Sequence, residues 1–362
     1  MANKRATNTQ LHKLDREIVE LINQRAELAL TRPAGEAPSA EAVDPIAAQY
    51  AVDNNDGPLP AAAVGAVFRE LLSGIRAASQ PTRVAYLGPE YTYSHLATIA
   101  RFGQSAELVP VATIAAAFDE VAQGHAQFAV VPIENSTDGR VADSLECFAR
   151  AGSSPTPTPN LQPQICGEVP LRIHHCLFSR GTRAEIRRVC SKPQALSQCR
   201  NWLAAHLPAA KLEPTSSTAE AAALAAAEPD TAAIGARQAA VNHGLNVLAE
   251  NIEDNAENVT RFAVIGAGAA ARTGRDKTSL VFEAPHQPGA LADAMAIFKR
   301  AKLNLTWIES FPIPSARGRY LFFVEFQGHA TDAAVKRAVA SLAKKSLRLV
   351  VLGSYAEATV VD

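Results

Sequence analysis

A polar loop that follows a buried strand holds the most informative residues of this chain. Residues 127–131 are apolar and rich in β-branched side chains, which predicts a buried strand, and Pro132 is expected to break its ladder. Hydrogen-bonding side chains crowd the loop that follows, which Gly139 closes, in the order Glu134, Asn135, Ser136, Thr137 and Asp138. Open α/β sheets bind ligands at the carboxyl ends of their strands. The residues alone leave two interpretations open, a ligand site and a capped turn into the next helix.

Two hydroxyl side chains lie where an earlier strand meets a helix. Thr92 and Ser94 stand between a strand predicted over residues 84–87 and a helix predicted over residues 95–102. Both are natural N-caps, and the unpaired N–H groups of a helix N-terminus attract a carboxylate. Carboxylate binding and simple capping are both open for Ser94.

Two other motifs suggest chemistry that their context does not support. His174 and His175 are adjacent on a predicted strand, so they face opposite sides and a structural role is the better interpretation than a metal pair. Residues 262–271 mimic a strand leading into the dinucleotide fingerprint GxGxxA. Only twelve residues separate Ile265 from Thr278, too few for a crossover helix, and the acidic ribose contact is missing. We therefore reject a dehydrogenase.

The composition limits the classes of protein to which the chain can belong. At 362 residues it is too long for one typical core, so two or three domains are expected. A net charge of −1, without a basic run longer than two residues, gives little support to nucleic acid or membrane-surface partners. No apolar stretch reaches the ~18 residues of a membrane span, and the charged first thirty residues are unlike a secretory signal.

The cysteines indicate a reducing environment. There are five, they lack CxxC spacing, and they stand at positions 147, 166, 176, 190 and 199. They are expected to be small buried residues in the cytoplasm, and to form neither a disulfide framework nor a zinc site.

The first 80 residues are predicted to form a small all-helical domain. An amphipathic helix over residues 10–30 carries an apolar stripe made of Leu11, Leu14, Ile18, Leu21 and Leu28. Arg25 falls on this stripe, where it either meets an anion or snorkels at the helix end. Residues 31–60 are rich in Ala, Pro, Asp and Gly, and a second helix is expected over residues 61–78.

The rest of the chain is predicted to form two further units. Over residues 83–266 short apolar strands alternate with helices, which predicts an α/β sheet with helices on its faces. This unit includes a strand at residues 169–178 and an extended, polyproline-like loop at residues 153–159. After a linker, residues 276–362 follow the order β-α-β-β-α-β of the ferredoxin-like split motif.

Four motifs, in order and spacing, resemble those of prephenate dehydratases. They are Tyr86-Leu-Gly-Pro-Glu-Tyr-Thr-Tyr-Ser94, Pro132-Ile-Glu-Asn-Ser136, Ser191-Lys-Pro-Gln194 with Gln198, and Asn258-Val-Thr-Arg-Phe262. The resemblance implies a two-lobed α/β dehydratase domain, like a periplasmic binding protein, over residues 83–266. It also implies an ACT regulatory domain over residues 276–362 and, before the dehydratase, a chorismate mutase-like helical domain over residues 1–80, as in bifunctional P-proteins.

The resemblance also implies an activity. Prephenate dehydratases remove carbon dioxide and water from the dianion prephenate, and aromatisation drives the reaction, so no metal, cofactor or redox step is expected. The positions that match the catalytic set are Asn135, Ser191, Gln198, Thr260 and Arg261. The expected substrate-binding positions are Thr92, Ser94 and Ser136. Tyr91 stands where the family usually has glycine, so contacts made by its loop are in doubt.

Thr260 is the expected proton donor to the leaving hydroxyl, with Arg261 as a polarising neighbour. The other members of the catalytic set are neutral hydrogen-bonding groups, which avoid clamping the departing carboxylate. Without the family context, Thr260 would be read as a strand residue whose hydroxyl caps a turn.

The mutase-like part departs from the family pattern. Arg25 occupies one position of the cation cage that chorismate rearrangement requires, whereas Asn8, Glu36 and Ala47 stand where further charged groups are usual, and Ile75 replaces a small polar residue. One arginine cannot compensate a dianion, and Glu36 would repel it. We expect a degenerate mutase domain that serves in dimerisation.

The ACT part is expected to bind phenylalanine as a feedback effector. The matching positions are Gly289, Ala290, Leu291, Glu309 and Ser310, and Phe311 replaces an arginine of the family motif. Together these features predict a cytoplasmic prephenate dehydratase of phenylalanine biosynthesis, a homodimer or larger homo-oligomer without nucleic acid or membrane partners. The alternatives are a fully bifunctional mutase and dehydratase, and an amino-acid-sensing regulatory protein with an inactive cleft.

Overall fold

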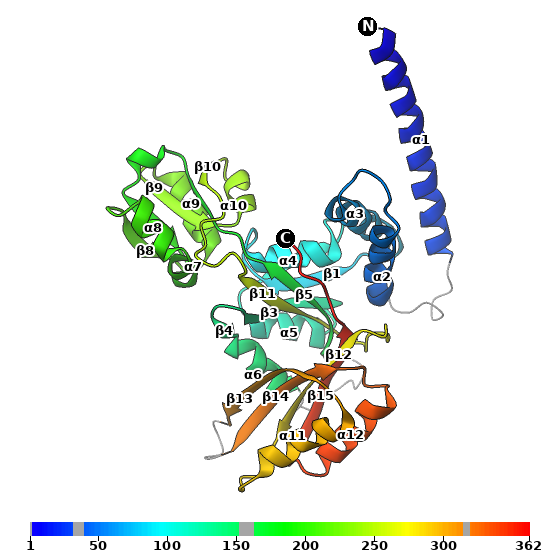
Figure 1. Ribbon diagram of the computed structural model, residues 1–362. Coiled ribbons are helices and arrows are strands. Elements are labelled where there is room, and N and C mark those ends of the chain that lie inside the picture. Colours follow the sequence, from blue (N-terminus) through cyan, green and yellow to red (C-terminus); the bar gives the residue numbers. More distant parts are fainter. Residues whose placement is uncertain (1, 32–39, 152–162, 314–318) are drawn as a thin grey trace. The chain divides into compact units, whose positions relative to one another are not determined.

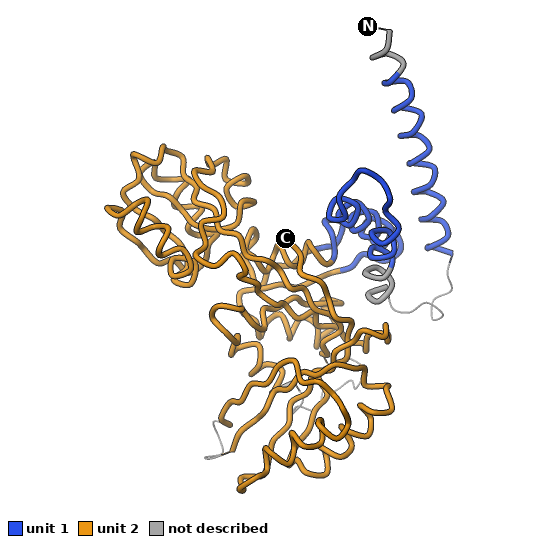
Figure 2. The backbone as a smooth tube through the Cα atoms, viewed as in Figure 1, with its two compact units in different colours: residues 1–82, 102–107 blue, residues 83–101, 108–362 orange. Residues whose placement is uncertain are grey.

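The computed structural model describes residues 2–31, 40–151, 163–313 and 319–362 (Figure 1). The chain forms two compact units, which Figure 2 colours separately: residues 1–82 with 102–107, and residues 83–101 with 108–362. Glu36 and the loop predicted at residues 153–159 lie outside the described residues.

The first unit is all-helical, as predicted. Its helices are α1 (Ala2–Leu30), α2 (Ala40–Asp53) and α3 (Ala61–Ser79), and α2 packs against α3. Helix α2 was not expected, because Pro and Asp in this stretch concealed the high helix propensity of its many alanines. The apolar stripe of α1 is not buried: Leu14 is 48% exposed and Leu28 72%. Such a stripe is expected to pack against another surface.

The second unit contains three sheets, of which sheet A lies at the centre of the dehydratase-like region. Its strand order is β2 (Glu107–Val111), β1 (Arg83–Leu87), β3 (Phe128–Asn135), β11 (Val259–Gly266) and β5 (Gln164–Arg172), with β4 (Gly139–Arg140) beside β3. Strands β1 and β3 are parallel, whereas β11 is antiparallel to β3 and to β5. Helices α4 (Tyr93–Phe102), α5 (Ile114–Ala122) and α6 (Ala142–Ala151) accompany this sheet. The central residues of β1 and β3 are buried, as expected for strands covered on both faces.

Strand β3 continues past Pro132, where a break was expected. Opposite Pro132 the register of β11 shifts between Arg261 and Phe262, and such an irregularity accommodates a residue that cannot donate a ladder hydrogen bond. Glu134 and Asn135 therefore belong to the strand and point to opposite faces of it.

Sheet B forms a second lobe. Its strand order is β10 (Asn246–Ala249), β6 (Cys176–Ser179), β9 (Thr231–Gly235), β7 (Arg188–Ser191) and β8 (Lys211–Pro214). Its helices are α7 (Pro193–Gln198), α8 (Arg200–His206), α9 (Thr218–Ala227) and α10 (Arg237–Asn242). Together with sheet A this arrangement confirms the predicted two-lobed α/β domain.

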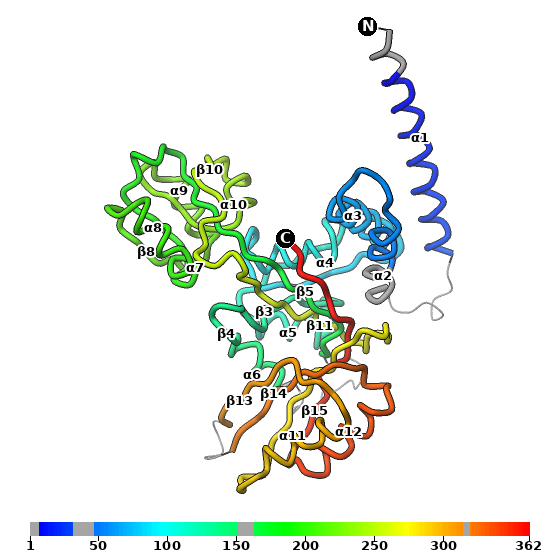
Figure 3. The backbone as a smooth tube through the Cα atoms, viewed as in Figure 1, coloured from blue at the N-terminus to red at the C-terminus, as the bar shows by residue number. Residues whose placement is uncertain are grey.

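The chain crosses between the two lobes twice (Figure 3). Residues 173–175 divide the strand predicted at residues 169–178 into β5 and β6, which lie in different sheets. Residues 250–258 return from β10 to β11. The buried Glu253 carboxylate holds both crossings together, because it contacts His174 Nδ1 and accepts a hydrogen bond from the backbone N–H of His175, each at 2.8 Å.

Sheet C and two helices form the C-terminal part. The antiparallel strands β13 (Leu305–Pro312), β14 (Tyr320–Gln327), β12 (Asp276–Glu283) and β15 (Arg348–Ala356) lie in this order, and α11 (Ala290–Ala301) and α12 (Ala333–Ala343) cover one face (Figure 1). This confirms the predicted βαββαβ order. At Gly353 (φ 155°) a Cβ atom would lie 2.0 Å from the carbonyl oxygen of Ile165 in β5, so sheet C approaches sheet A closely there. Among the described residues, no helix is long and apolar enough to cross a membrane.

Candidate active site

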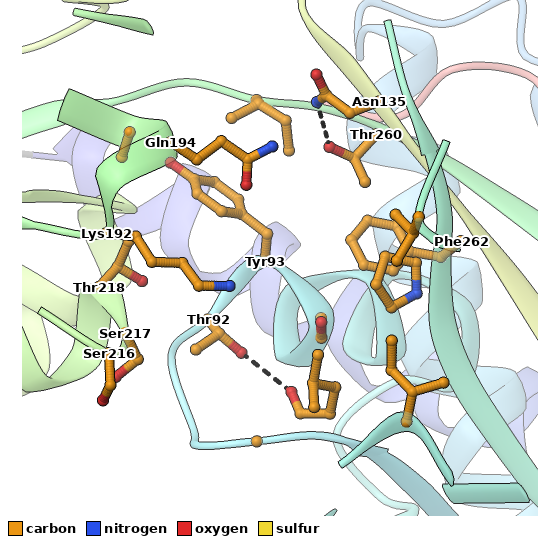
Figure 4. Close-up of a pocket in the computed structure, with 18 of the residues that line it drawn as sticks. Thr92, Tyr93, Asn135, Lys192, Gln194, Ser216, Ser217, Thr218, Thr260 and Phe262 are labelled. Atoms are coloured by element: carbon orange, nitrogen blue, oxygen red, sulfur yellow. Dashed lines mark hydrogen bonds between the residues drawn. The ribbon is translucent and has the colours of Figure 1, made fainter. Parts of the chain in front are cut away.

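A cavity of about 420 Å³ lies between the sheet A lobe and the sheet B lobe. Strand ends and helix starts of both lobes line it (Figure 4). Its polar lining side chains are those of Thr92, Tyr93, Ser94, Asn135, Asp143, His175, Lys192, Gln194, Gln198, Ser216, Ser217, Thr218 and Thr260.

Asn135 and Thr260 form the polar centre of the sheet A wall. They are partners on the adjacent strands β3 and β11, and Asn135 Nδ2 donates to Thr260 Oγ1 at 2.8 Å and to Asn258 Oδ1 at 2.9 Å (Figure 4). Asn135 Oδ1 accepts from the backbone N–H groups of Thr137 and Asp138 at 2.9 and 3.0 Å. All donors and acceptors of this amide are thus occupied. Because the Thr260 oxygen accepts from Asn135, its own proton is available to the cavity.

Three predicted site residues, all among those described, do not line this cavity. Ser191 is fully buried and its hydroxyl donates to the carbonyl oxygen of Ile234 at 2.7 Å, so it fastens β7 to β9. Ser136 Oγ accepts from the backbone N–H of Val259 at 3.0 Å. Arg261 Nη1 contacts Glu134 at 2.9 Å, and its Nη2 contacts Glu168 at 2.8 Å and Glu325 at 2.6 Å.

The placement of Arg261 contradicts the expectation that it polarises the Thr260 hydroxyl. Successive side chains of a strand point to opposite faces, so Arg261 turns away from the cavity when Thr260 faces it. Burial alone would lower the pKa of the Arg261 guanidinium, but the charges of Glu325 and Glu168 outweigh burial and raise it.

A chain of hydrogen bonds connects the two lobes beside the cavity. Tyr93 OH lies 2.9 Å from His175 Nδ1, and His175 Nε2 lies 2.9 Å from Gln198 Oε1. Gln198 Nε2 donates to Asp138 Oδ2 at 2.6 Å, and Gln194 donates to the same carboxylate. The chain therefore runs from α4 through the first crossing to α7 and back to the loop after β3.

The Asp138 carboxylate, at one end of this hydrogen-bond chain, determines which group donates in each of the other hydrogen bonds. An ionised carboxylate only accepts, so the Gln198 amide turns its NH₂ toward Asp138 and its oxygen toward His175. His175 must then carry its proton on Nε2, and its Nδ1 faces Tyr93 OH as an acceptor, while the carbonyl oxygen of His174 also accepts from that hydroxyl at 2.8 Å. Burial lowers the pKa of His175, against smaller opposing effects of the Gln198 hydrogen bond and Glu253, and this keeps the ring neutral. Burial also raises the pKa of Tyr93, which stays a donor.

The sheet B wall supplies a cation. Among the described residues that line the cavity, Lys192 is the one lysine or arginine, and its side chain extends into the space opposite Thr92 (Figure 4). The N-termini of α4 and α9 also reach the cavity, through Tyr93, Ser94 and Thr218. Helix N-termini carry unpaired N–H groups and partial positive charge, so the start of α9 on this wall and the start of α4 on the sheet A wall both suit an anion.

Thr92 and Ser94 line the cavity, and Thr92 occupies the predicted N-cap position of α4, where its carbonyl oxygen accepts from the backbone N–H of Leu96 at 3.0 Å. The helix starts at Tyr93, and the Thr92 hydroxyl donates to the carbonyl oxygen of Pro89 at 2.8 Å, while Ser94 lies inside the first turn. Tyr91 has φ 63°, a conformation that glycine adopts most readily, and its ring packs against the core of the sheet B lobe instead of lining the cavity.

The predicted effector residues lie on sheet C and its first helix. Gly289, with φ 84°, immediately precedes α11, which begins with Ala290 and Leu291. Glu309 and Ser310 lie on the edge strand β13, where Arg140 Nη1 of β4 contacts Glu309 Oε2 at 2.9 Å and donates to the Ser310 carbonyl at 3.2 Å.

Sequence reasoning missed several lining residues. His175 was assigned a structural role, and Tyr93, Lys192 and Gln194 were quoted within motifs without a role of their own. Lys192 lies between β7 and α7 and Gln194 lies in the first turn of α7, and this position at the carboxyl end of a parallel strand was a usable signal.

The buried His175 predicts a pH dependence of stability. Because its pKa is lowered on folding, the unfolded chain binds more protons, and stability falls as pH drops below the unfolded value of about 6.5. The slope of unfolding free energy against pH from 7 to 5 should be shallower in His175→Gln by at most about 1.4 kcal/mol per pH unit. Urea unfolding of both proteins measures this, with exposed His286→Gln as the control. Equal slopes in all three proteins would contradict the assignment.

Comparisons with known proteins agree with this geometry. The family model for prephenate dehydratase matches residues 84–270. The chain is 38% identical to a bifunctional chorismate mutase/prephenate dehydratase from Stutzerimonas stutzeri, over 98% of each chain, and 38% identical to one from Neisseria gonorrhoeae, over 96% of this chain and 95% of the relative. The structure of a prephenate dehydratase from Arthrobacter aurescens in complex with L-Phe has a TM-score of 0.68 and 35% identity, covering 76% of this chain and 90% of that one. This chain therefore belongs to the prephenate dehydratase family.

Proposed function

We propose that this dehydratase uses the cavity between its two lobes to convert prephenate into phenylpyruvate, carbon dioxide and water, for the synthesis of phenylalanine in the cytoplasm. The observation that carries the proposal is the Asn135–Thr260 pair, a fully oriented neutral donor on the cavity wall. An amino-acid sensor with an inactive cleft would have no need of this arrangement, which favours the enzyme.

The reaction requires one proton and no oxidant. The bond between the ring and its carboxylate breaks, carbon dioxide leaves, and the electron pair moves through the ring as it becomes aromatic. The bond between the ring and its hydroxyl then breaks, and this oxygen leaves as water after receiving a proton. The enzyme must therefore orient the ring and supply that proton, and its donor regains a proton from solvent water before the next turnover.

Thr260 is placed to supply the proton. Its oxygen accepts from Asn135 at 2.8 Å, which directs the hydroxyl proton toward the cavity. Both side chains are neutral, so neither holds the departing carboxylate by charge. Asn135 is itself fixed by Asn258 and by two backbone N–H groups, so little reorganisation is needed when the reaction begins.

Lys192 and the N-termini of α4 and α9 are the proposed carboxylate contacts. A single lysine can hold the side-chain carboxylate of prephenate while the ring carboxylate faces neutral groups. Ser191 supports this arrangement indirectly, because its hydrogen bond to Ile234 fixes the strand end that precedes Lys192 and α7.

Removing the Thr260 hydroxyl should abolish most turnover with little loss of stability. Thr260→Ala should lower kcat by about 10²–10⁴-fold, because the leaving hydroxyl loses its proton donor. The unfolding free energy should fall on the order of 1 kcal/mol, since one buried Asn135 hydrogen loses its acceptor. Phenylpyruvate formation from prephenate measures kcat, and Thr260→Ser, which keeps the hydroxyl, should remain active. An alanine variant with native turnover would refute the proposed donor.

We also propose that the ACT part binds phenylalanine as a feedback effector near Gly289–Leu291 and Glu309–Ser310. The start of α11 suits an amino-acid carboxylate, and the Arthrobacter relative was solved with L-Phe.

Titration calorimetry should show heat with phenylalanine, and Gly289→Val should weaken binding because φ 84° disfavours a branched side chain. No heat from the native protein would remove this effector.

The helical unit is proposed to be a degenerate mutase that joins two copies of the chain. The apolar stripe of α1 is exposed, and a second α1 would bury it in a homodimer. Arg25 is half-buried on this helix, while Glu36 and the side chain of Asp44 lie outside the described residues. The match to bifunctional relatives over the whole chain fits the alternative of a working mutase.

Chorismate decides between these two alternatives. A degenerate mutase leaves chorismate unchanged while the same protein sample converts prephenate in a parallel control. The purified protein is given chorismate alone, and chorismate loss and phenylpyruvate gain are followed together. Loss of chorismate with formation of phenylpyruvate would show a bifunctional enzyme.

A further inference from the structure

A group of buried charges lies behind the Asn135–Thr260 pair. Glu134 precedes Asn135 on β3, Arg261 follows Thr260 on β11, and the two are register partners. Since alternate strand residues point to opposite faces, the catalytic pair faces the cavity and its neighbours face sheet C. The Asn135–Thr260 pair and the Glu134–Arg261 pair are thus neighbours along the same two strands, on opposite faces of the sheet.

Arg261 joins the catalytic strands to the ACT part. Its Nη2 contacts Glu325 Oε2 of β14 at 2.6 Å and Glu168 Oε2 of β5 at 2.8 Å, and its Nη1 contacts Glu134 Oε2 at 2.9 Å. Its guanidinium also lies over the ring of Trp307 in β13, 5.5 Å from the ring centroid. The Glu168 and Glu325 side chains are each 1% exposed, so water screens these contacts little.

Glu325 is itself held rigidly in sheet C. Tyr355 OH donates to its Oε2 and Thr306 Oγ1 to its Oε1, each at 2.8 Å, and Lys277 lies 3.6 Å from it. Burial raises the pKa of Glu325, but the charges of Arg261 and Lys277 outweigh this and lower it, which keeps the carboxylate ionised. A shift of β14 would therefore carry the Arg261 guanidinium with it.

A second contact ties the same hairpin to sheet C. Arg140 of β4 is the register partner of Glu134 and contacts Glu309 of β13 at 2.9 Å. The segment between β3 and β4 contains Asp138, which accepts from Gln198 on the other lobe. The hairpin that carries Asn135 is thus fastened to sheet C and to the sheet B wall of the cavity.

Stability alone does not account for such a cluster. Three carboxylates and two cations are buried or half-buried together, and replacing buried ion pairs by apolar residues is often neutral or stabilising. What the cluster does provide is a fixed distance between β14 and the ends of β3 and β11.

We propose that Arg261 and Glu134 are positioning residues, through which Glu325 of the ACT sheet sets the geometry of the Asn135–Thr260 pair and thereby the rate of the chemical step. This inference deepens the proposed function and rests on it. A movement of the ACT sheet changes turnover by this route, without any contact between that sheet and the substrate.

The test uses charge-removing variants of the full-length protein that keep side-chain shape. Glu325→Gln acts from the ACT side, Glu134→Gln from the catalytic strand, and the double variant combines them. Asp332→Asn is the matched control, because this ACT carboxylate pairs at 2.7 Å with Arg272 and not with a residue of β3 or β11. The readouts are kcat and KM for prephenate well below the unfolding temperature, and hydrogen exchange of the Thr137 and Asp138 backbone N–H groups.

Each single Gln variant should lower kcat about 10- to 100-fold with KM little changed, because the catalytic pair is displaced after binding. The double variant should be no slower than the slower single variant, because both act through Arg261. The N–H groups of Thr137 and Asp138 should exchange faster, since they donate to Asn135 Oδ1. Asp332→Asn should match the native protein in all three measurements.

Native kcat and native exchange in folded Glu325→Gln and Glu134→Gln proteins would overturn the inference. If Glu325→Gln does not fold, Glu134→Gln decides the question by the same readouts. A native protein that never converts prephenate would refute the proposed function instead. Hydrogen exchange would then still decide whether Glu325 positions the Asn135 side chain.

Discussion

The side-chain amide of Asn135 is the constraint on which the cavity depends. Its two hydrogens go to Thr260 and Asn258, and its oxygen receives two backbone N–H groups of the following loop. A buried amide satisfied in this way has one orientation, because a flip would place donors against donors. That orientation makes Thr260 an acceptor on one side and a donor on the other. The same contacts shape the loop that carries Asp138, and so the amide also determines where the second lobe is held.

The chemistry explains why the wall is mainly neutral. A dianion that must lose one carboxylate as carbon dioxide is poorly served by a cage of arginines, because ground-state charge pairing would oppose the departure. The cavity instead offers one lysine, two helix N-termini and a set of hydroxyl and amide groups, together with the Asp143 carboxylate and the His175 ring. Arg261, one residue from Thr260, is turned to the opposite face and compensated by three carboxylates. Strand alternation thus separates the Thr260 hydroxyl from a structural charge only one residue away.

The sequence was sufficient for the fold class and for part of the site, and the reasons are physical. The family resemblance singled out Asn135, Gln198 and Thr260, which line the cavity, whereas the residues alone left a purely structural role open for Asn135 and Thr260. The direction of Arg261 was predicted wrongly because adjacency in sequence was taken for adjacency in space, although β periodicity separates them. The extent of β3 was missed because Pro132 is accommodated by a register shift in β11, which is far away in sequence although it pairs with β3 in the sheet. The role of His175 could not be predicted, since its partners Tyr93 and Gln198 come from two lobes that meet only after folding.

The most direct test of the account is a crystal structure of the Thr260→Ala protein with prephenate bound. The account predicts the ring hydroxyl of prephenate beside the alanine methyl, within hydrogen-bond distance of the position that the Thr260 oxygen occupies in the native chain. It also predicts the side-chain carboxylate at Lys192. A substrate whose hydroxyl faced the sheet B wall, or whose carboxylates both avoided Lys192, would contradict the proposed roles of these two residues.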